Sequence, residues 1–356
     1  MDHTKKLYDA LSRWLRPDNT TLKAAIDQTV EEGLFSFTDL KSQIFALKGT
    51  LTLPALQHWL SVTSTVPGKL AGNKVLVLNA GNLPLVGVHD LIGITLTGAS
   101  YLGKLSSKDP YLLPSLLTEL REHYPDRTFS WSVSLNDFKG EQADALIYTG
   151  SEENQNEVTG RLRAMQTIRP DTPLLLRTSH FSIAWIEGRD TGTIRNLTEA
   201  MLRYGGQGCR SVAMVVAPFG LKEAECLLTD HAELFWLQSP PHQPASGALN
   251  YRFAYNKASG TDQLYLDYFL LEEKDVKPTH PSVVQWIKGD EYSLRSLVQS
   301  FKQGLQTIYR ADSKEGIEIE GFITEPLSSA QTPPLWWKPD RVDTLQWLNS
   351  NLQEIV

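Results

Sequence analysis

The chain has 356 residues, 41% of them hydrophobic and 21% charged, and a net charge of −7. This composition is ordinary for a globular protein large enough for two domains, and the acidic balance disfavours nucleic acid and anionic membranes as partners. The only cysteines are Cys209 and Cys226, which excludes a disulfide framework and favours a reducing, cytoplasmic location.

The first 62 residues are expected to form helices. Leu7 and Leu11 fall on one helical face, and Pro17 ends that run. Two further helices are predicted at about 21–33 and 38–49, because each stretch ends at a glycine. A helical layer of this kind usually covers a core and carries no chemistry itself.

From Lys74 onward, short apolar runs alternate with helical patterns, which predicts a parallel sheet covered on both faces. The start of the chain has no apolar leader, and polar residues interrupt the most apolar region, 75–102, so we expect no signal peptide and no membrane span. Strands are expected at 74–78, 100–105, 129–133 and 143–148, and helices at 91–97, from Asp109-Pro110, and at 154–166.

A second alternation follows residue 172, so the predicted fold class is α/β with two units and an N-terminal helical layer. We expect domains at 1–172 and 173–335, and a segment at 336–356 that packs back on the chain or lies at an interface between copies. The later strands are expected at 174–176, 181–186, 211–217 and 263–271, and the later helices at 191–204, 221–236 and 342–352.

Cys209 lies among three glycines and a glutamine, between a predicted helix and a predicted buried strand. Glycines allow close approach of a ligand to the backbone, and nearby N–H groups can stabilise a thiolate. Arg210 could add positive potential. On local sequence alone, a small core residue is an equally good interpretation of Cys209. Cys226 lies in a helical stretch without a glycine turn and is expected to pack.

Polar residues follow three of the predicted strands of the first unit. An amide in such a position can donate to a developing oxyanion, and backbone N–H groups at the start of a helix can bind a phosphate. Simple turns, a solvated strand end or a helix cap explain the same residues. The residues are Asn82 after the first strand, Lys104, Ser106 and Ser107 after the second, and Thr149, Gly150 and Ser151 after the fourth.

Taken in order, the motifs between Asn79 and Pro218 resemble those of the aldehyde dehydrogenase superfamily, and most closely its LuxC-type acyl-CoA reductase branch. Gly206-Gln207-Gly208-Cys209 is similar to the motif of the catalytic cysteine. The other similar segments are Ala80-Gly81-Asn82 for the asparagine turn, Lys104-Leu105-Ser106-Ser107 for the cofactor-ribose motif, and Tyr148-Thr149-Gly150-Ser151 for the pyrophosphate motif.

The resemblance implies an aldehyde-dehydrogenase-like fold, with a Rossmann-like cofactor domain in 1–172 and a catalytic domain in 173–335. It makes Cys209 the nucleophile and Asn82 an oxyanion donor. It assigns the cofactor to Lys104, Ser106, Ser107, Thr149, Gly150 and Ser151.

Two departures from the superfamily pattern bear on the reaction. Segment 176–180 lacks the glutamate that activates water in hydrolytic members, which suits acyl exchange with a thiol. Ser107 replaces the glutamate that binds ribose hydroxyls, and with Lys108 beside it a 2′-phosphate is tolerated. The resemblance therefore implies NADPH as the cofactor, with NADH as the alternative.

The implied function is reduction of acyl-CoA to an aldehyde through an acyl-cysteine intermediate, by a cytoplasmic homo-oligomer. No metal, nucleic acid or membrane span is expected. Two alternatives stay open: an aldehyde dehydrogenase, including one that uses coenzyme A as acceptor, and a non-catalytic cofactor-binding relative.

Overall fold

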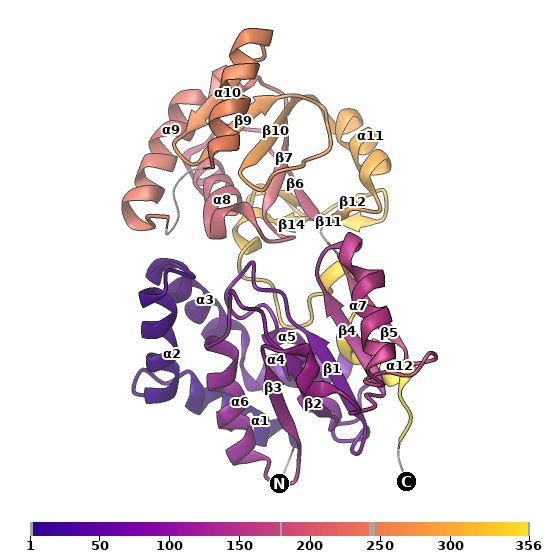
Figure 1. The fold of residues 1–356 in the computed structure, drawn as a ribbon. Helices are drawn as coiled ribbons and strands as arrows, with labels where there is room; N and C mark the ends of the chain where they lie inside the picture. The colour runs from indigo at the N-terminus through magenta and orange to yellow at the C-terminus, as the bar shows by residue number, and fades with distance from the viewer. Residues whose placement is uncertain (1–2, 179, 242–245, 355–356) are drawn as a thin grey trace. The chain divides into compact units, whose positions relative to one another are not determined.

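The chain folds into two compact α/β units (Figure 1). The computed structural model describes residues 3–178, 180–241 and 246–354. The first unit comprises Met1–Ser179 together with Pro334–Val356, and the second comprises His180–Pro333. The chain therefore leaves the first unit, completes the second, and returns to the first.

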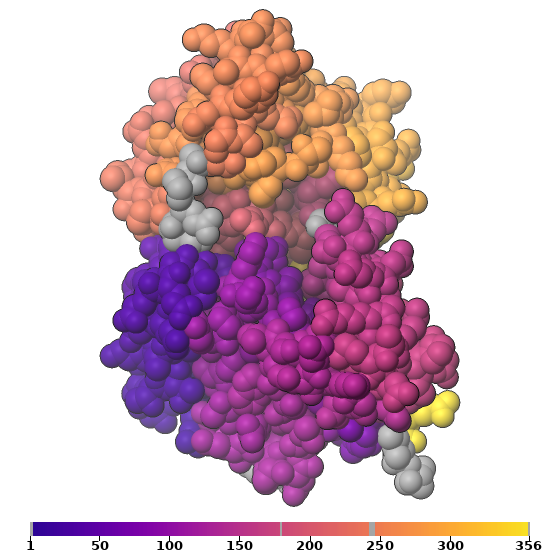
Figure 2. Space-filling model, in the orientation of Figure 1, coloured from indigo at the N-terminus to yellow at the C-terminus, as the bar shows by residue number. Residues whose placement is uncertain are grey.

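Four helices form the N-terminal layer of the first unit, one more than the three located from the sequence. α1 buries Leu7, Leu11 and Trp14, and the Trp14 indole donates to Ser115 Oγ at 2.8 Å. α2 and α3 form an outer surface of this unit (Figure 2), on which Phe45 is exposed. The helices are α1 (His3–Trp14), α2 (Thr20–Glu31), α3 (Phe37–Thr50) and α4 (Leu53–Val62).

The first unit is built on a five-stranded parallel sheet of order β3-β2-β1-β4-β5. β1 pairs with both β2 and β4, so the direction of strand succession reverses between β1 and β4. In open parallel sheets, the crevice outside the carboxyl ends at such a reversal is the usual ligand site. The strands are β1 (Lys74–Leu78), β2 (Ser100–Lys104), β3 (Phe129–Ser132), β4 (Ala145–Thr149) and β5 (Leu174–Arg177).

β5 pairs with β4, so the first unit extends beyond the boundary expected at residue 172. Both faces of the sheet are buried, which explains why its strands read as continuous apolar runs. Alternate residues of β1 divide between the two faces: Val75 and Val77 belong to one core, Leu76 and Leu78 to the other. The covering helices are α5 (Val88–Thr97), α6 (Leu112–His123), α7 (Glu152–Ala164) and α12 (Thr344–Asn351).

A buried ion pair fastens the returning C-terminal segment to the first unit. The Arg177 guanidinium contacts both carboxylate oxygens of Asp90 at 2.5 and 2.6 Å, and it donates to Thr344 Oγ1 at 2.8 Å. Thr344 in turn donates to Asp90 at 2.8 Å. Burial works to raise the pKa of Asp90, but Arg177 and His89 outweigh it and hold that pKa well below its usual range.

The second unit contains a seven-stranded sheet of order β14-β11-β6-β7-β10-β9-β8. Here the direction of strand succession reverses between β6 and β11. The strands are β6 (Phe181–Trp185), β7 (Val212–Ala217), β8 (Gln263–Leu266), β9 (Phe269–Glu273), β10 (Val283–Lys288), β11 (Leu305–Arg310) and β14 (Glu325–Pro326), with a separate hairpin of β12 (Glu318–Ile319) and β13 (Phe322–Ile323). The helices are α8 (Thr191–Leu202), α9 (Leu221–Gln238), α10 (Gly247–Ser259) and α11 (Glu291–Phe301).

The single strand expected at 263–271 is wrong. The structure has two antiparallel strands there, β8 and β9, joined by a tight turn at Asp267 and Tyr268. Asp267 adopts a φ of +57°, which such a two-residue turn requires. The sequence gives no glycine or asparagine at this turn, so the usual hairpin signal is missing.

The predicted α/β class, with a helical layer before the first parallel sheet, is confirmed. Within the described ranges, no helix is both long and apolar enough to cross a bilayer. Those same ranges contain no group of three or more His, Cys, Asp or Glu side chains able to hold a metal ion.

Replacing Asp90 with Asn should destabilise the protein strongly, because the buried Arg177 guanidinium then lacks a counter-charge. Removing one partner of a buried ion pair typically costs about 3–5 kcal/mol. Urea unfolding of D90N against wild type measures this loss. The control is the double variant D90L/R177M, which removes both charges and should lose much less. A double variant as unstable as D90N would show that the uncompensated charge is not the cause.

Candidate functional site

The Cys209 turn, residues 203–211, connects α8 to the buried strand β7. Tyr204, Gly205 and Gly206 all adopt left-handed backbone conformations, with φ values of +57°, +64° and +71°. Gly206 lies against the carbonyl oxygen of Pro281, which a Cβ on residue 206 would approach to 2.3 Å. These conformations explain the glycines in the motif. They also place the partly buried Cys209 at the amino end of β7.

Two hydroxyl groups fix the backbone at Cys209 and at the next residue. Ser182 on β6 donates to the Cys209 carbonyl at 2.9 Å, and Tyr309 on β11 donates to the Arg210 carbonyl at 3.2 Å. The Ser211 N–H closes the turn onto the Gly208 carbonyl at 2.9 Å. The position of Cys209 is therefore set by three strands of the second sheet, which is the rigid support that a nucleophile needs.

Arg210 is buried and serves mainly as a structural clamp. Its guanidinium pairs with Glu325 at 2.7 Å and donates to the carbonyls of Ser329 and Ala330 at 3.0 and 2.9 Å. Burial works to lower the pKa of Arg210, but Tyr309 and Glu325 outweigh it and keep the pKa raised. Because Glu325 compensates the charge, the positive potential expected from Arg210 beside the thiol is reduced.

The prediction that Cys226 packs into the core is wrong, because Cys226 is exposed on α9. The buried residues of that helix follow a different stripe, formed by Leu221, Ala224, Leu228 and Ala232. The predicted helix is present, but Cys226 lies on the face opposite to this buried stripe.

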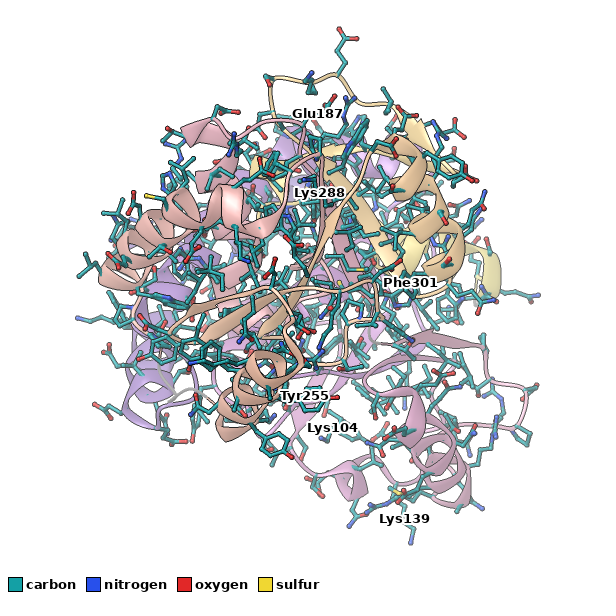
Figure 3. The ribbon with its side chains drawn as sticks, turned by 90° about the horizontal axis from the view of Figure 1, so that it is seen from above. Lys104, Lys139, Glu187, Tyr255, Lys288 and Phe301 are labelled. Carbon is teal, nitrogen blue, oxygen red and sulfur yellow. The ribbon has the colours of Figure 1, made fainter. Side chains whose placement is uncertain are left out.

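The Asn82 loop, residues 79–87, follows β1 and contacts the loop that follows β2. A Cβ on Gly81 would come within 2.5 Å of the Ser106 side chain and within 2.9 Å of Lys108 Cβ. Asn79 joins the same two loops, because its backbone N–H and its side-chain amide both donate to the Lys104 carbonyl, at 2.9 and 3.2 Å. The partly buried Asn82 and the residues proposed for the cofactor ribose thus share one edge of the first sheet (Figure 3, Lys104 labelled).

The Thr149-Gly150-Ser151 segment ends β4, on the other side of the strand-order reversal. The Tyr148 hydroxyl folds over Gly150 and donates to the Ser151 carbonyl at 2.9 Å. Ser151 occupies the cap position of α7, but among the described residues no side chain caps this helix. The alternative interpretation of Ser151 as a helix cap is therefore not supported by a hydrogen bond, and the first N–H groups of α7 have no partner within the helix.

The corresponding edge of the second sheet is occupied by the protein's own carboxylates. Asp190 accepts from the Thr193 N–H at 2.9 Å, Asp290 from the Ser293 N–H at 3.0 Å, and Glu223 from the Gly220 N–H at 2.9 Å. These bonds cap the N-termini of α8, α11 and α9 in turn. Capped helix N-termini have no need of an external anion, so this edge is a poor phosphate site.

An ion pair also joins the carboxyl ends of β6 and β11, where the strand order of the second sheet reverses. Arg310 at the end of β11 pairs with Glu187, which follows β6, at 2.8 Å. The Arg310 guanidinium lies over the Trp185 ring at 4.5 Å. Glu187 and Lys288 mark this edge in Figure 3. The chemistry of the second unit is therefore expected at the opposite edge, where Cys209 lies.

The sequence predicts a helix from Asp109-Pro110, but α6 begins at Leu112, and the main contact of Asp109 is with another loop. Its Oδ2 accepts from the N–H of Leu85 in the Asn82 loop at 2.8 Å. Burial raises the pKa of Asp109 to about 6, although the amides of Leu85 and Leu112 act against this rise. Tyr309 was missed as well, because its partner Arg210 is distant in sequence and no local pattern marks the pair.

The structure thus groups the predicted residues by unit. Lys104 and Thr149 end β2 and β4, and Asn82, Ser106, Ser107, Gly150 and Ser151 lie on the loops beyond the carboxyl edge of the first sheet. Cys209 belongs to the second unit. In segment 176–180, Arg177 is held by Asp90, and Ser179 lies outside the described residues.

Gly206→Ala should destabilise the protein more than Gly205→Ala. Both positions require a left-handed backbone, which costs a residue with a Cβ roughly 1–2 kcal/mol. Only at Gly206 does the new Cβ also collide with the Pro281 carbonyl, whereas Gly205 has no atom within 4 Å. Urea unfolding of the two variants compares them directly. Equal losses would mean that the contact with Pro281 does not shape the Cys209 turn.

No protein-family model and no curated protein matches the chain. Solved structures do resemble it. An NAD-dependent benzaldehyde dehydrogenase from Corynebacterium glutamicum superimposes with a TM-score of 0.64 at 12% identity, over 96% of this chain and 83% of that one. Glyceraldehyde-3-phosphate dehydrogenase from Methanocaldococcus jannaschii, complexed with NADP, gives 0.60 at 12% identity, over 87% and 76%.

Aldehyde dehydrogenase 21 from Physcomitrella patens, in complex with its product succinate, gives a TM-score of 0.59 at 13% identity, over 88% of this chain and 74% of that one. Identities this low establish the fold and nothing finer. The predicted architecture is confirmed at that level: the chain has the aldehyde-dehydrogenase fold, with a Rossmann-like first unit, a second α/β unit and an N-terminal helical layer.

Proposed function

We propose that the chain is a nicotinamide-dependent reductase that converts acyl-CoA to aldehyde through a thioester on Cys209. The observation that carries the proposal is the Cys209 turn. It holds a partly buried thiol at the end of a buried strand, and hydroxyl groups from two neighbouring strands fix the backbone around it. A cysteine kept only for packing does not need this support.

The first unit is proposed to bind the cofactor. Three features support this assignment: the strand-order reversal between β1 and β4, the N-terminus of α7 that no described side chain caps, and the polar loop after β2. Thr149, Gly150 and Ser151 would hold the pyrophosphate, and Lys104, Ser106 and Ser107 the ribose and its phosphate. The carboxylates of Glu152 and Glu153, in the first turn of α7, weaken the attraction of the helix N-terminus for an anion. The contact with the pyrophosphate is therefore proposed to consist mainly of hydrogen bonds from backbone N–H groups.

The neighbours agree with a nicotinamide cofactor, because one is described as NAD-dependent and another is complexed with NADP. When bound, the cofactor supplies the hydride that reduces the thioester carbonyl. Ser107 and Lys108 are exposed and can accept a 2′-phosphate, which favours NADPH over NADH.

The residues of the chain have separate tasks in this mechanism. The Cys209 thiolate attacks the acyl-CoA carbonyl, the bond to the coenzyme A sulfur breaks, and coenzyme A leaves as a thiolate. Asn82 and the Cys209 N–H are proposed to stabilise the carbonyl oxygen whenever it carries negative charge. After reduction, collapse of the thiohemiacetal oxyanion releases the aldehyde and restores the Cys209 thiolate.

The preference for a thiol over water as the acyl partner rests on segment 176–180. No glutamate is present there to activate water, and Arg177 is committed to Asp90 and Thr344. This disfavours hydrolysis of the acyl-enzyme and favours exchange with a thiol. The second candidate is an aldehyde dehydrogenase that uses coenzyme A as the acceptor. It shares the same acyl-cysteine and differs in the direction of hydride transfer.

Mixing the protein with a panel of acyl-CoAs, without cofactor, should add one acyl group to Cys209. Intact-protein mass spectrometry should detect the adduct in wild type and in C226A, and it should be absent from C209A. Adding NADPH should discharge it and yield aldehyde. C226A is the matched control because Cys226 is the other cysteine and is exposed. An adduct that persists in C209A, or no adduct with any acyl-CoA, contradicts the proposal.

Ser107→Glu should shift the cofactor preference from NADPH toward NADH. The new carboxylate repels a 2′-phosphate and can accept hydrogen bonds from ribose hydroxyls instead. Fluorescence titration of both cofactors measures the ratio of the two dissociation constants, which should change by at least about tenfold. Ser130→Glu, on the exposed part of β3, adds the same charge to this unit and should leave the ratio unchanged. An unchanged ratio in S107E would remove this loop from the cofactor site.

A further inference from the structure

Asp109 makes a long-range contact for which its position in sequence gives no reason. It lies between β2 and α6, and its side chain reaches into the Asn82 loop after β1. Only 5% of the residue is exposed. Oδ2 accepts from the Leu85 N–H at 2.8 Å, while Oδ1 is buried and has no hydrogen-bond partner within the described structure. A buried carboxylate with one unpaired oxygen is costly, which indicates that its bond to Leu85 matters.

The residue that donates this hydrogen bond, Leu85, has a strained backbone. Leu85 has a φ of +61°, a conformation that costs a residue with a side chain roughly 1–2 kcal/mol, and its side chain is buried. Such a residue persists only when its surroundings hold it in place. Asp109 holds the N–H of Leu85, three residues after Asn82.

Contacts of Asn79 hold the two ends of the Asn82 loop. The Asn79 side-chain amide donates to the Lys104 carbonyl and to the Tyr101 hydroxyl at the start of the loop, and its Oδ1 packs against Gly87 at the end. In the middle of the loop, Gly81 packs against the Ser106 loop and the Leu85 N–H bonds Asp109.

We infer that Asp109 is a positioning residue, which fixes the Asn82 loop by accepting the Leu85 N–H so that the Asn82 amide is held ready to stabilise an oxyanion. This inference rests on the proposed function for the role of Asn82. The geometry of the loop itself is independent of that role. Asp109 is buried, and in this proposal it acts through the loop and does not touch substrate or cofactor.

The variants separate geometry from charge. Asp109→Ala removes the acceptor and leaves the Leu85 N–H without a partner. Asp109→Asn keeps an oxygen in place of Oδ2 and should preserve the bond to Leu85, so it is the matched control. The serine side chain of Asp109→Ser is too short for its oxygen to reach the Leu85 N–H. This variant therefore provides a second loss of the contact if Asp109→Ala does not fold.

The first measurement is amide hydrogen exchange across residues 79–87 in the full chain. Exchange in this loop should be at least about tenfold faster in D109A or D109S than in wild type, and D109N should match wild type. Exchange in β7 of the second unit serves as the internal reference and should not change. Unchanged exchange of the loop in D109A and D109S overturns the inference.

The second measurement is the single-turnover rate of aldehyde formation at saturating acyl-CoA and NADPH. A misplacement of about 1 Å can slow a reaction by about 10²-fold. D109A should therefore lose rate with little change in KM, and D109N should restore most of it. The double variant N82A/D109A should be no slower than N82A, because Asp109 acts through Asn82. Additive losses, or a D109N as slow as D109A, overturn the inference.

The two proposals fail in different ways. If N82A itself turns over at the wild-type rate, the oxyanion role of Asn82 is wrong, and hydrogen exchange alone then decides whether Asp109 holds the loop. If N82A is slow and the loop of D109A stays protected, the proposed function stands and the role of Asp109 does not.

Discussion

β1 is flanked on both sides by parallel strands, and this one constraint determines where the first unit can do chemistry. Because parallel strands end at the same edge, the loops after β1, β2 and β4 must emerge together. The reversal of strand order between β1 and β4 falls at this same edge, which is where open parallel sheets usually bind their ligands. The tight packing of Gly81 on Ser106 follows from this arrangement.

Both sheets reverse their strand order beside their first strand, β1 or β6, but the side chains at their carboxyl edges differ. In the second sheet, Asp190, Asp290 and Glu223 cap the helix N-termini, and the Glu187–Arg310 pair closes the reversal. In the first sheet, α7 begins without a side-chain cap. The second sheet therefore has carboxylates at its carboxyl edge, whereas we propose that the corresponding edge of the first sheet binds the cofactor and that Cys209, at the other end of the second sheet, is the nucleophile.

The strands that local sequence predicts are apolar runs such as β1, β4 and β7, whose residues are mostly buried. β10 and β11 are largely buried as well, but local patterns located neither of them, nor the helices α10 and α11. The turn at Asp267 lacks glycine, so one strand is expected where β8 and β9 lie. Cys226 is exposed, although it is expected to pack, because it lies outside the buried stripe of α9.

In the candidate site, too, local features could be predicted from the sequence and long-range contacts could not. The glycines around Cys209 could be identified from sequence, and two of them, Gly205 and Gly206, adopt the left-handed backbone that glycine favours. The groups that hold the turn and the Asn82 loop could not. Tyr309 and Asp109 act on residues distant in the chain, and neither stands in a motif. Contacts of this kind depend on the completed fold, which local patterns do not encode.

The discontinuity of the first unit has a consequence for the order of folding. Asp90 and Arg177 are synthesised early, whereas Thr344, which completes their network, lies in the last helix of the chain. The second unit is continuous in sequence and can close as soon as it leaves the ribosome. The first unit is therefore completed only after the second unit has been synthesised. Until α12 emerges during translation, the apolar face of α5 that it covers stays exposed. A nascent chain stalled before residue 344 is expected to be the form most dependent on chaperones.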